Sequence, residues 1–313
     1  MFARWSMPRA GGFFRQPTRL TGCLVLTLAL TATGCRLPAT QGPVSRSLAA
    51  SRQLSQQGVS ALDAGDWSTA EHLFNEAVET CDSDANAHRH YAETLWHRGK
   101  RAEALAQLDE AIGLSPEDDT LLVRAAEMRL ASGDATRAQQ DVRSAIDINP
   151  RSLSAWMLAG RIEVAGGHQR DALAAFHKAL SLAPDSRDTL LELAECYRRL
   201  GEPERALVNL QTLADTYPPG EEPRQVTYLE GMALSAMGRQ QDAVDALVQA
   251  AARGAPDAAL LCSLAEAESR AGLADNAWRD VQRALSVDPR HAASRRLAAQ
   301  LGLARQSTGR ITR

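Results

Sequence analysis

Small and apolar residues recur between positions 51 and 291 in a pattern that repeats every 34 residues. Each unit contains a glycine, an alanine five residues later, and then apolar residues at further offsets of four and three. Offsets of three and four mark one face of an α-helix. The glycines are spaced by 34 residues except for one step of 37, and they are Gly65, Gly99, Gly133, Gly167, Gly201, Gly238 and Gly272.

This pattern predicts two helices in every unit. The glycine ends the first helix, where a left-handed backbone costs it little, and a proline ends the second helix in most units. Each helix pair leaves an apolar face that only its neighbour can cover, so the units are expected to stack. The predicted units are 51–84, 85–118, 119–152, 153–186, 187–220, 224–257 and 258–291, with three extra residues within 219–223.

The fourth unit contains the residues that identify the family. Trp156, Gly160, Ala172, Phe176 and Pro184 resemble the pattern of the tetratricopeptide repeat, whose 34-residue unit has a Trp, a small residue, an alanine, a large apolar residue and a closing proline. The resemblance implies an all-α fold, a right-handed α-solenoid of seven helix-turn-helix repeats. Residues 292–303 are predicted to form a C-terminal capping helix, and residues 304–313 a disordered tail.

The N-terminal 34 residues differ from the rest. They contain arginines and no acidic residue, followed by an apolar stretch at 23–32 that is too short to span a bilayer but has the length of a secretory signal. The stretch ends in Ala32-Thr33-Gly34-Cys35, which resembles the lipobox of bacterial lipoproteins.

This resemblance implies a lipoprotein signal peptide over 1–34, lipid attachment at Cys35 and a flexible tether over 35–50. The chain is then expected to be exported to the bacterial cell envelope and anchored in a membrane, facing the periplasm. An ordinary cleaved signal, which would leave a soluble periplasmic or secreted protein, and a retained anchor are the alternatives. Leu20-Thr21-Gly22-Cys23 is a second lipobox-like tetrapeptide, but no apolar run precedes it.

Composition argues against several other classes of protein. The net charge of −3 gives no general attraction to nucleic acid. No P-loop, GxSxG, HExxH or Cys/His cluster is present, so we expect no enzymatic activity, small-molecule substrate, cofactor or metal. His90 and His97 lie two helical turns apart, about 10 Å, too far to share one ion. Cys81, Cys196 and Cys262 form no CxxC pair and are expected to be inert thiols.

In the tetratricopeptide family the first helix of each repeat lines a concave surface, which implies a protein-binding groove at defined repeat positions. Acidic residues recur at position nine, and larger apolar residues lie along the same predicted surface. Trp96 packing against the next helix, and Arg89, Arg124 and Arg161 pairing with neighbouring glutamates, are the alternatives to partner contact. The groove candidates are Arg52, Arg89, His90, Glu93, Trp96, Arg124, Glu127, Met157, Arg161, Glu195, Tyr228, Met232 and Glu266.

Three functions follow from this reading. The first is a scaffold, anchored in the cell envelope by its lipid, that binds a partner protein or peptide in the groove. Its architecture also resembles bacterial tetratricopeptide lipoproteins that act as pilotins or assembly factors for secretion and pilus systems. The second is a structural subunit that self-associates, with the groove filled by a second copy. The third, an enzyme, would require a pocket with perturbed titratable groups.

Overall fold

The structure is a computed structural model that describes the backbone of residues 43–311 and the side chains of residues 46–303. Within this part of the chain the secondary structure is entirely helical. The helices are α1 (Pro43–Asp63), α2 (Trp67–Thr80), α3 (Ala85–His97), α4 (Arg101–Leu114), α5 (Asp119–Ala131), α6 (Ala135–Ile148), α7 (Leu153–Ala165), α8 (Gln169–Leu182), α9 (Arg187–Arg199), α10 (Pro203–Ala214), α11 (Arg224–Ala236), α12 (Gln240–Ala252), α13 (Ala258–Arg270), α14 (Ala274–Val287) and α15 (Ala292–Ile311).

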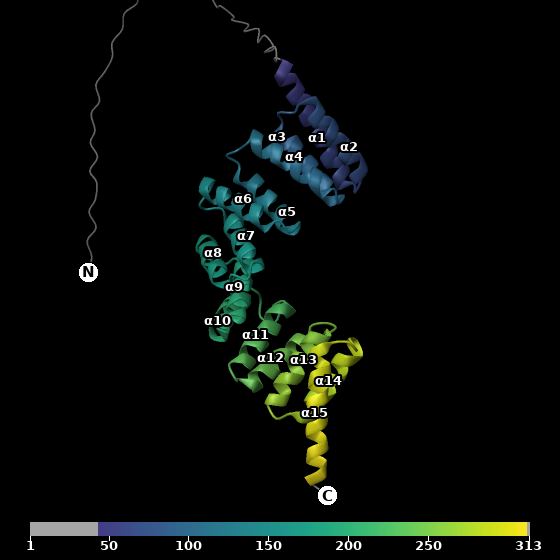
Figure 1. Ribbon diagram of the computed structural model, residues 1–313, viewed down its shortest axis with the longest axis vertical. Helices are drawn as coiled ribbons and strands as arrows, with labels where there is room; N and C mark the ends of the chain where they lie inside the picture. The colour runs from purple at the N-terminus through teal and green to yellow at the C-terminus, as the bar shows by residue number, and fades with distance from the viewer. Residues whose placement is uncertain (1–42, 312–313) are drawn as a thin grey trace, which may run out of the picture. The chain divides into compact units, whose positions relative to one another are not determined.

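The helices pack in the order of the sequence, as a tetratricopeptide-type α-solenoid (Figure 1). Odd-numbered helices from α1 to α13 are the first helices of the seven repeats, and each contacts the even-numbered second helix that follows it. Each second helix also contacts the first helix of the next repeat, and α15 covers α13 and α14. Several consecutive first helices contact each other directly: α1 with α3, α5 with α7, and α11 with both α9 and α13. The first helices therefore form one face, the first-helix face, and the second helices form the other, the second-helix face.

Every first helix ends at its repeat glycine. The seven glycines have φ between 71° and 87°, the left-handed region that side chains with a Cβ rarely adopt. The residue after the glycine donates its backbone N–H to a carbonyl five residues earlier, as from Asp66 to Ala61 at 2.9 Å and from His168 to Glu163 at 2.8 Å. This is a Schellman motif, and it confirms the predicted role of the glycines.

Short polar side chains begin most of the first helices. Asp84 accepts hydrogen bonds from the backbone N–H groups of Asn86 and Ala87, and Asp118 accepts one from Thr120. Such N-caps satisfy donors that have no partner inside the helix. Asp84 also accepts a hydrogen bond from Ser51 at 2.9 Å, which ties the start of α3 to α1.

The core consists of small residues packed against a few large ones. The alanines five residues after each glycine are at most 1% exposed. Gly160 on α7 faces the ring of Phe176 on α8, and a Cβ added to the glycine would lie 2.4 Å from the ring. Gly58 and Gly231 stand in the same way against Phe74 and Leu247. Like the repeat alanines, these three glycines lie where the paired helices pack too closely for a larger side chain.

Both predicted ends of the array need correction. Helix α1 begins at Pro43, inside the predicted tether, and α15 runs to Ile311, through most of the predicted disordered tail. Proline is well tolerated in the first turn of a helix, and Ala304, Arg305 and Gln306 are strong helix formers. The predicted signal peptide, Cys35 and the start of the tether lie outside the described residues. None of the helices in the described part is long and apolar enough to cross a membrane.

Candidate protein-binding face

Charged groove candidates pair with one another across neighbouring first helices. Arg124 on α5 donates to both carboxylate oxygens of Glu93 on α3, at 2.6 and 2.7 Å. It also donates to Glu127 at 2.8 Å. The hydrogen bonds to Glu93, and to a lesser extent that to Glu127, raise the pKa of the Arg124 guanidinium. These three side chains thus hold repeats two and three together, which supports the internal-pairing alternative for Arg124.

In repeats four and five, one ion pair crosses between first helices and the others lie within a single helix. Arg161 on α7 donates to Glu192 on α9 at 2.8 Å. Glu195 accepts from Arg198 at 2.7 and 2.8 Å and from Arg199 at 3.1 Å, and these bonds, Arg198 first, lower the pKa of its carboxyl. Partly exposed pairs contribute about 0–1 kcal/mol each. Their main effect is to neutralise the acidic row that the sequence predicted at position nine.

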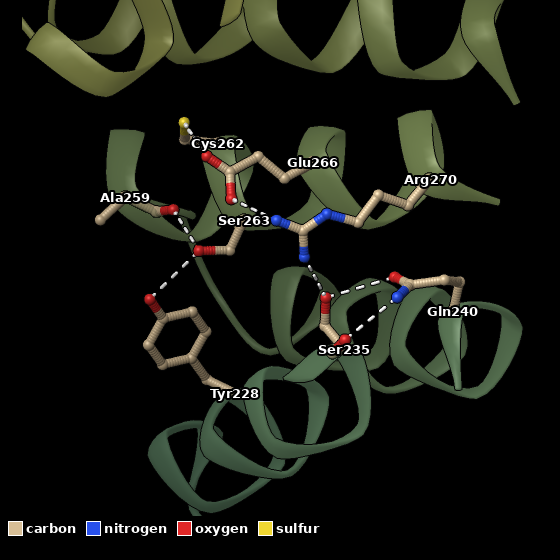
Figure 2. A network of polar contacts seen from close by, with 8 residues as sticks. All are labelled: Tyr228, Ser235, Gln240, Ala259, Cys262, Ser263, Glu266 and Arg270. Carbon is tan, nitrogen blue, oxygen red and sulfur yellow. Dashed lines mark hydrogen bonds and ion pairs between the residues drawn. The ribbon is translucent and has the colours of Figure 1, made fainter. Parts of the chain in front are cut away.

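A polar network joins the last two repeats (Figure 2). Arg270 on α13 donates to Ser235 on α11 at 3.1 Å and lies 4.0 Å from Glu266. The hydroxyls of Tyr228 and Ser263 lie 3.3 Å apart. Tyr228, a groove candidate, therefore contacts repeat seven directly, whereas the candidate Glu266 is linked to repeat six only through Arg270.

An apolar row runs along the first-helix face of the first four repeats. Its members lie 34 residues apart at position twelve of each repeat, are half-buried, and are Leu62, Trp96, Leu130 and Val164. Position twelve lies one turn beyond position nine, so Trp96, Leu130 and Val164 stand beside Glu93, Glu127 and Arg161. In repeats five to seven the same position holds the polar residues Arg198, Ser235 and Ser269. The apolar row therefore ends after repeat four.

Trp96 illustrates how these side chains are held. Its ring packs against a core cluster that includes Leu108 and Met128, and the Arg101 guanidinium lies 5.5 Å from the ring centroid. Packing against the next helices, the alternative raised from the sequence, is thus part of its role. The ring nevertheless stays half exposed. Sequence reasoning singled out Trp96 and missed Leu62, Leu130 and Val164, although repeat position twelve was the signal that would have found them.

Met157 is a correction to the predicted groove. Its side chain is 8% exposed and belongs to the core cluster of repeats four to seven. Its sulfur accepts a hydrogen bond from Thr189 at 3.0 Å. A long, flexible thioether fills the gap between α7 and α9, so it is not available to a partner.

The other candidates are distributed unevenly. Arg52 is exposed, whereas Arg89, His90 and Met232 are half-buried. The His90 ring stacks on the buried Phe74 with centroids 5.4 Å apart. Burial, with a smaller effect of Arg89, lowers the pKa of His90 and so favours its neutral imidazole. His90 therefore contributes a flat, largely apolar surface rather than a charge.

The remaining histidines of the cluster have structural partners. His88 is buried, 2.8 Å from Gln107 and 2.9 Å from the carbonyl of Asp82. The His97 ring stacks on Trp67 with centroids 3.3 Å apart. No group of three potential metal ligands occurs among residues 43–311.

Four buried titratable groups, three thiols and one carboxyl, lie within the repeats. Cys81, Cys196 and Cys262 are buried free thiols, and burial raises the pKa of Cys196 to about 11. Glu268 on α13 is 3% exposed, and its Oε2 has no hydrogen-bond partner among the described residues. Burial, followed by the charge of Asp280, raises the pKa of Glu268 to about 7.

Family models for the tetratricopeptide repeat match residues 55–119 and 167–225. These ranges fall within repeats one to three and four to six of the architecture described above. The chain is a tetratricopeptide repeat protein. The Gly, Ala and Pro positions that repeat through the intervening and C-terminal units extend the same architecture to α14.

Curated relatives share parts of this repeat chain. Human tetratricopeptide repeat protein 33 is 24% identical over 61% of this chain and 70% of its own length. Human protein O-mannosyl-transferase TMTC1 is 27% identical over 44% of this chain, but the match spans only 16% of that protein.

Solved structures share the fold. A tetratricopeptide repeat protein from Parabacteroides merdae has a TM-score of 0.59 at 17% identity, over 81% of this chain and 99% of its own. YrrB, described as a TPR protein with an unusual peptide-binding site, has a TM-score of 0.52 at 19% identity, over 60% of this chain and 95% of its own. PilW, described as a type IV pilus biogenesis factor, has a TM-score of 0.57 at 15% identity, over 65% and 93%.

Proposed function

We propose that this chain is a non-enzymatic scaffold that binds a partner protein through the first-helix face of repeats one to four. The observation that supports this most strongly is the half-buried apolar row of Leu62, Trp96, Leu130 and Val164. Its members recur on successive first helices and therefore offer one apolar contact per repeat. Trp is one of the residue types that most often dominate the binding energy of protein interfaces, and the Leu and Val side chains add apolar contact on either side of it.

The charged residues beside the row set specificity rather than affinity. Glu93, Arg124 and Glu127 satisfy one another, so a partner does not need to supply counter-charges to them. Packed helices lie about 8–10 Å apart, and a polyproline-II segment rises about 3.1 Å per residue with three residues per turn. Such a segment places every third side chain on one face about 9 Å apart, so an apolar residue at every third position matches this row.

The scaffold is tested by capturing partners from envelope extract. Wild type is compared with a Trp96→Ala, Leu130→Ala double variant and with a matched control, Val208→Ala, Val248→Ala, Val287→Ala. The three control valines are 61%, 48% and 55% exposed and lie on second helices. We expect the double variant to lose a captured protein that the control retains. Equal capture by all three proteins would refute the assignment of this face.

The envelope location is also a proposal, supported by the N-terminal sequence. We propose that Cys35 carries a lipid and that the repeats face the periplasm. Mass spectrometry of the native chain tests this. A lipidated N-terminus at Cys35 supports the proposal, whereas an intact N-terminus at Met1 or Met7 would overturn both lipidation and export.

Two alternatives remain distinct from the scaffold. A pilotin-like assembly factor would use the same face but bind a component of a secretion or pilus system. Self-association would instead fill the face with a second copy of the chain. Light scattering separates this last case, because a monomer at every concentration excludes it.

A further inference from the structure

A second apolar site lies on the opposite, second-helix face, where α6 and α8 flank α7. It is a pocket of about 490 Å³, within the size range of sites that bind small ligands and side chains. Its wall consists mainly of apolar groups, including Val142, Ile146, Trp156 and Ile162, together with Ala159, Ala174 and Ala175. The Trp156 indole N–H is satisfied by the carbonyl of Pro150 at 3.0 Å, which holds the ring in place.

Other repeat boundaries fill this position with side chains. Between repeats two and three, Arg129 on α5 pairs with Asp109 on α4 and Asp141 on α6. Within repeat two, Gln107 on α4 lies 2.8 Å from a ring nitrogen of His88 on α3. Asp141 and Gln107 both occupy position twenty-three of their repeats, the position that Ala175 occupies in repeat four. Ala175 leaves this position unfilled, whereas repeats two and three have polar side chains there that contact the first helix of the same repeat.

The three carboxylates that line the pocket differ in their surroundings. Glu163 accepts from Gln139 at 2.7 Å and lies 3.0 Å from a ring nitrogen of His168, so both of its oxygens are engaged. Asp171 lies in the first turn of α8, where the helix dipole favours a carboxylate. Asp147 stands at the far end of the pocket, near the end of α6.

Four charged residues that line the pocket, two carboxylates (Asp147 and Asp171) and two cations, form no ion pair within 4.0 Å of another described residue. The two cations, Arg143 on α6 and Lys178 on α8, are exposed. They occupy positions twenty-five and twenty-six of adjacent repeats, so they stand at nearly the same height on the two walls. A carboxylate above the apolar floor would be placed between them.

We infer that this pocket binds a partner segment in which a large apolar side chain lies within two residues of a carboxylate. The apolar side chain enters against Trp156, and the carboxylate is held by Arg143 and Lys178. Asp147 disfavours a second acid at the far end of the site and favours a basic residue there. This site is separate from the first-helix face and does not depend on it.

Random twelve-residue peptides displayed on phage provide the probe. Peptides selected on the wild-type protein are synthesised, and their affinities are measured by fluorescence anisotropy for wild type and three variants. Ala175→Gln fills the pocket with the residue that repeat two already has at this position. Arg143→Glu, Lys178→Glu reverses the rim charge. Ala246→Gln makes the matched change at position twenty-three of repeat six and serves as the control.

We expect a family of selected peptides to combine a large apolar residue with a nearby Asp or Glu. These peptides should lose at least tenfold in affinity for both Ala175→Gln and the charge-reversed variant, and bind Ala246→Gln like wild type. The inference is overturned if no selected peptide weakens on Ala175→Gln, if charge reversal leaves affinity unchanged, or if Ala246→Gln weakens binding equally. Because the charge-reversed residues are exposed, that variant stays informative even if Ala175→Gln folds poorly.

Discussion

Replacing Gly160 by alanine should destabilise the middle of the array, even though alanine is the better helix former. A Cβ at this position would meet three carbon atoms of the Phe176 ring at 2.4–2.6 Å. Phe176 is fully buried, so its ring has no free space to enter. Overpacking of this kind costs about 1–3 kcal/mol, while the change from Gly to Ala in a helix returns about 1 kcal/mol. The difference is a net loss of about 0–2 kcal/mol, and the 2.4 Å approach to a fully buried ring favours the upper end of this range.

The same chain contains the compensating pair. In repeat five the corresponding residues are Ala194 and Leu210, both 1% exposed. Phe176→Leu alone should cost about 1–2 kcal/mol, because the ring leaves a cavity against glycine. Combined with Gly160→Ala it recreates the repeat-five pair, so the double variant should be more stable than the sum of the single changes by about 1 kcal/mol or more.

Hydrogen exchange of the α7 and α8 amides is the appropriate assay, because repeat arrays can unfold in parts. Urea unfolding followed by circular dichroism gives the global comparison. Phe74→Leu is the matched control, since it removes the ring that faces Gly58 in repeat one. The reasoning fails if Gly160→Ala exchanges as slowly as wild type, or if Phe74→Leu rescues it as well as Phe176→Leu.

Three further predictions concern buried and paired groups. The pKa of Glu268 is raised from 4.5 to about 7 in the folded chain, so between these pH values the folded protein holds a proton that the unfolded chain has lost, and stability falls as pH rises. Glu268→Gln should therefore raise the melting temperature at pH 8 and change it little at pH 4.5. An equal shift at both pH values would contradict this prediction. Cys196 and Cys262, with raised thiol pKa values, should resist alkylation by iodoacetamide at pH 7.5 until urea is added, as followed by mass spectrometry. Arg124→Met should leave Glu93 without its partner and lower the urea midpoint, whereas Arg124→Met with Glu93→Gln should recover part of the loss; no recovery would mean that the pair is not coupled.

The fold followed from the sequence because its determinants are local and repeated. Gly65 and its six counterparts require a backbone conformation that few other residues adopt, and seven repetitions remove the ambiguity of any single one. The ends of the array did not follow. Pro43 and the residues after Leu303 lack the repeat pattern, so only their helix propensity was available, and it was underestimated.

The sequence predicted the candidate face only in part, because the position of a residue in its repeat indicates which side of the helix it lies on but not which residues it contacts. Position nine correctly located Glu93 and Arg161 near the helix interface, yet the sequence did not show that Arg161 selects Glu192 rather than Glu195. Position five included Met157, which the neighbouring helix α9 covers. The pocket at Trp156 is the space that the small side chain of Ala175 leaves between α6, α7 and α8. Such a space can be recognised only once the three helices are packed together.

Site-specific photo-crosslinking tests the central claim most directly. A benzophenone amino acid is placed in turn at Trp96 and Leu130 on the first-helix face, and at Val208 and Val287 on the second helices. The account predicts that, in cells, the first pair crosslinks to a distinct protein that the second pair does not reach. Crosslinks from Val208 and Val287 alone, or equal products from all four sites, would contradict it.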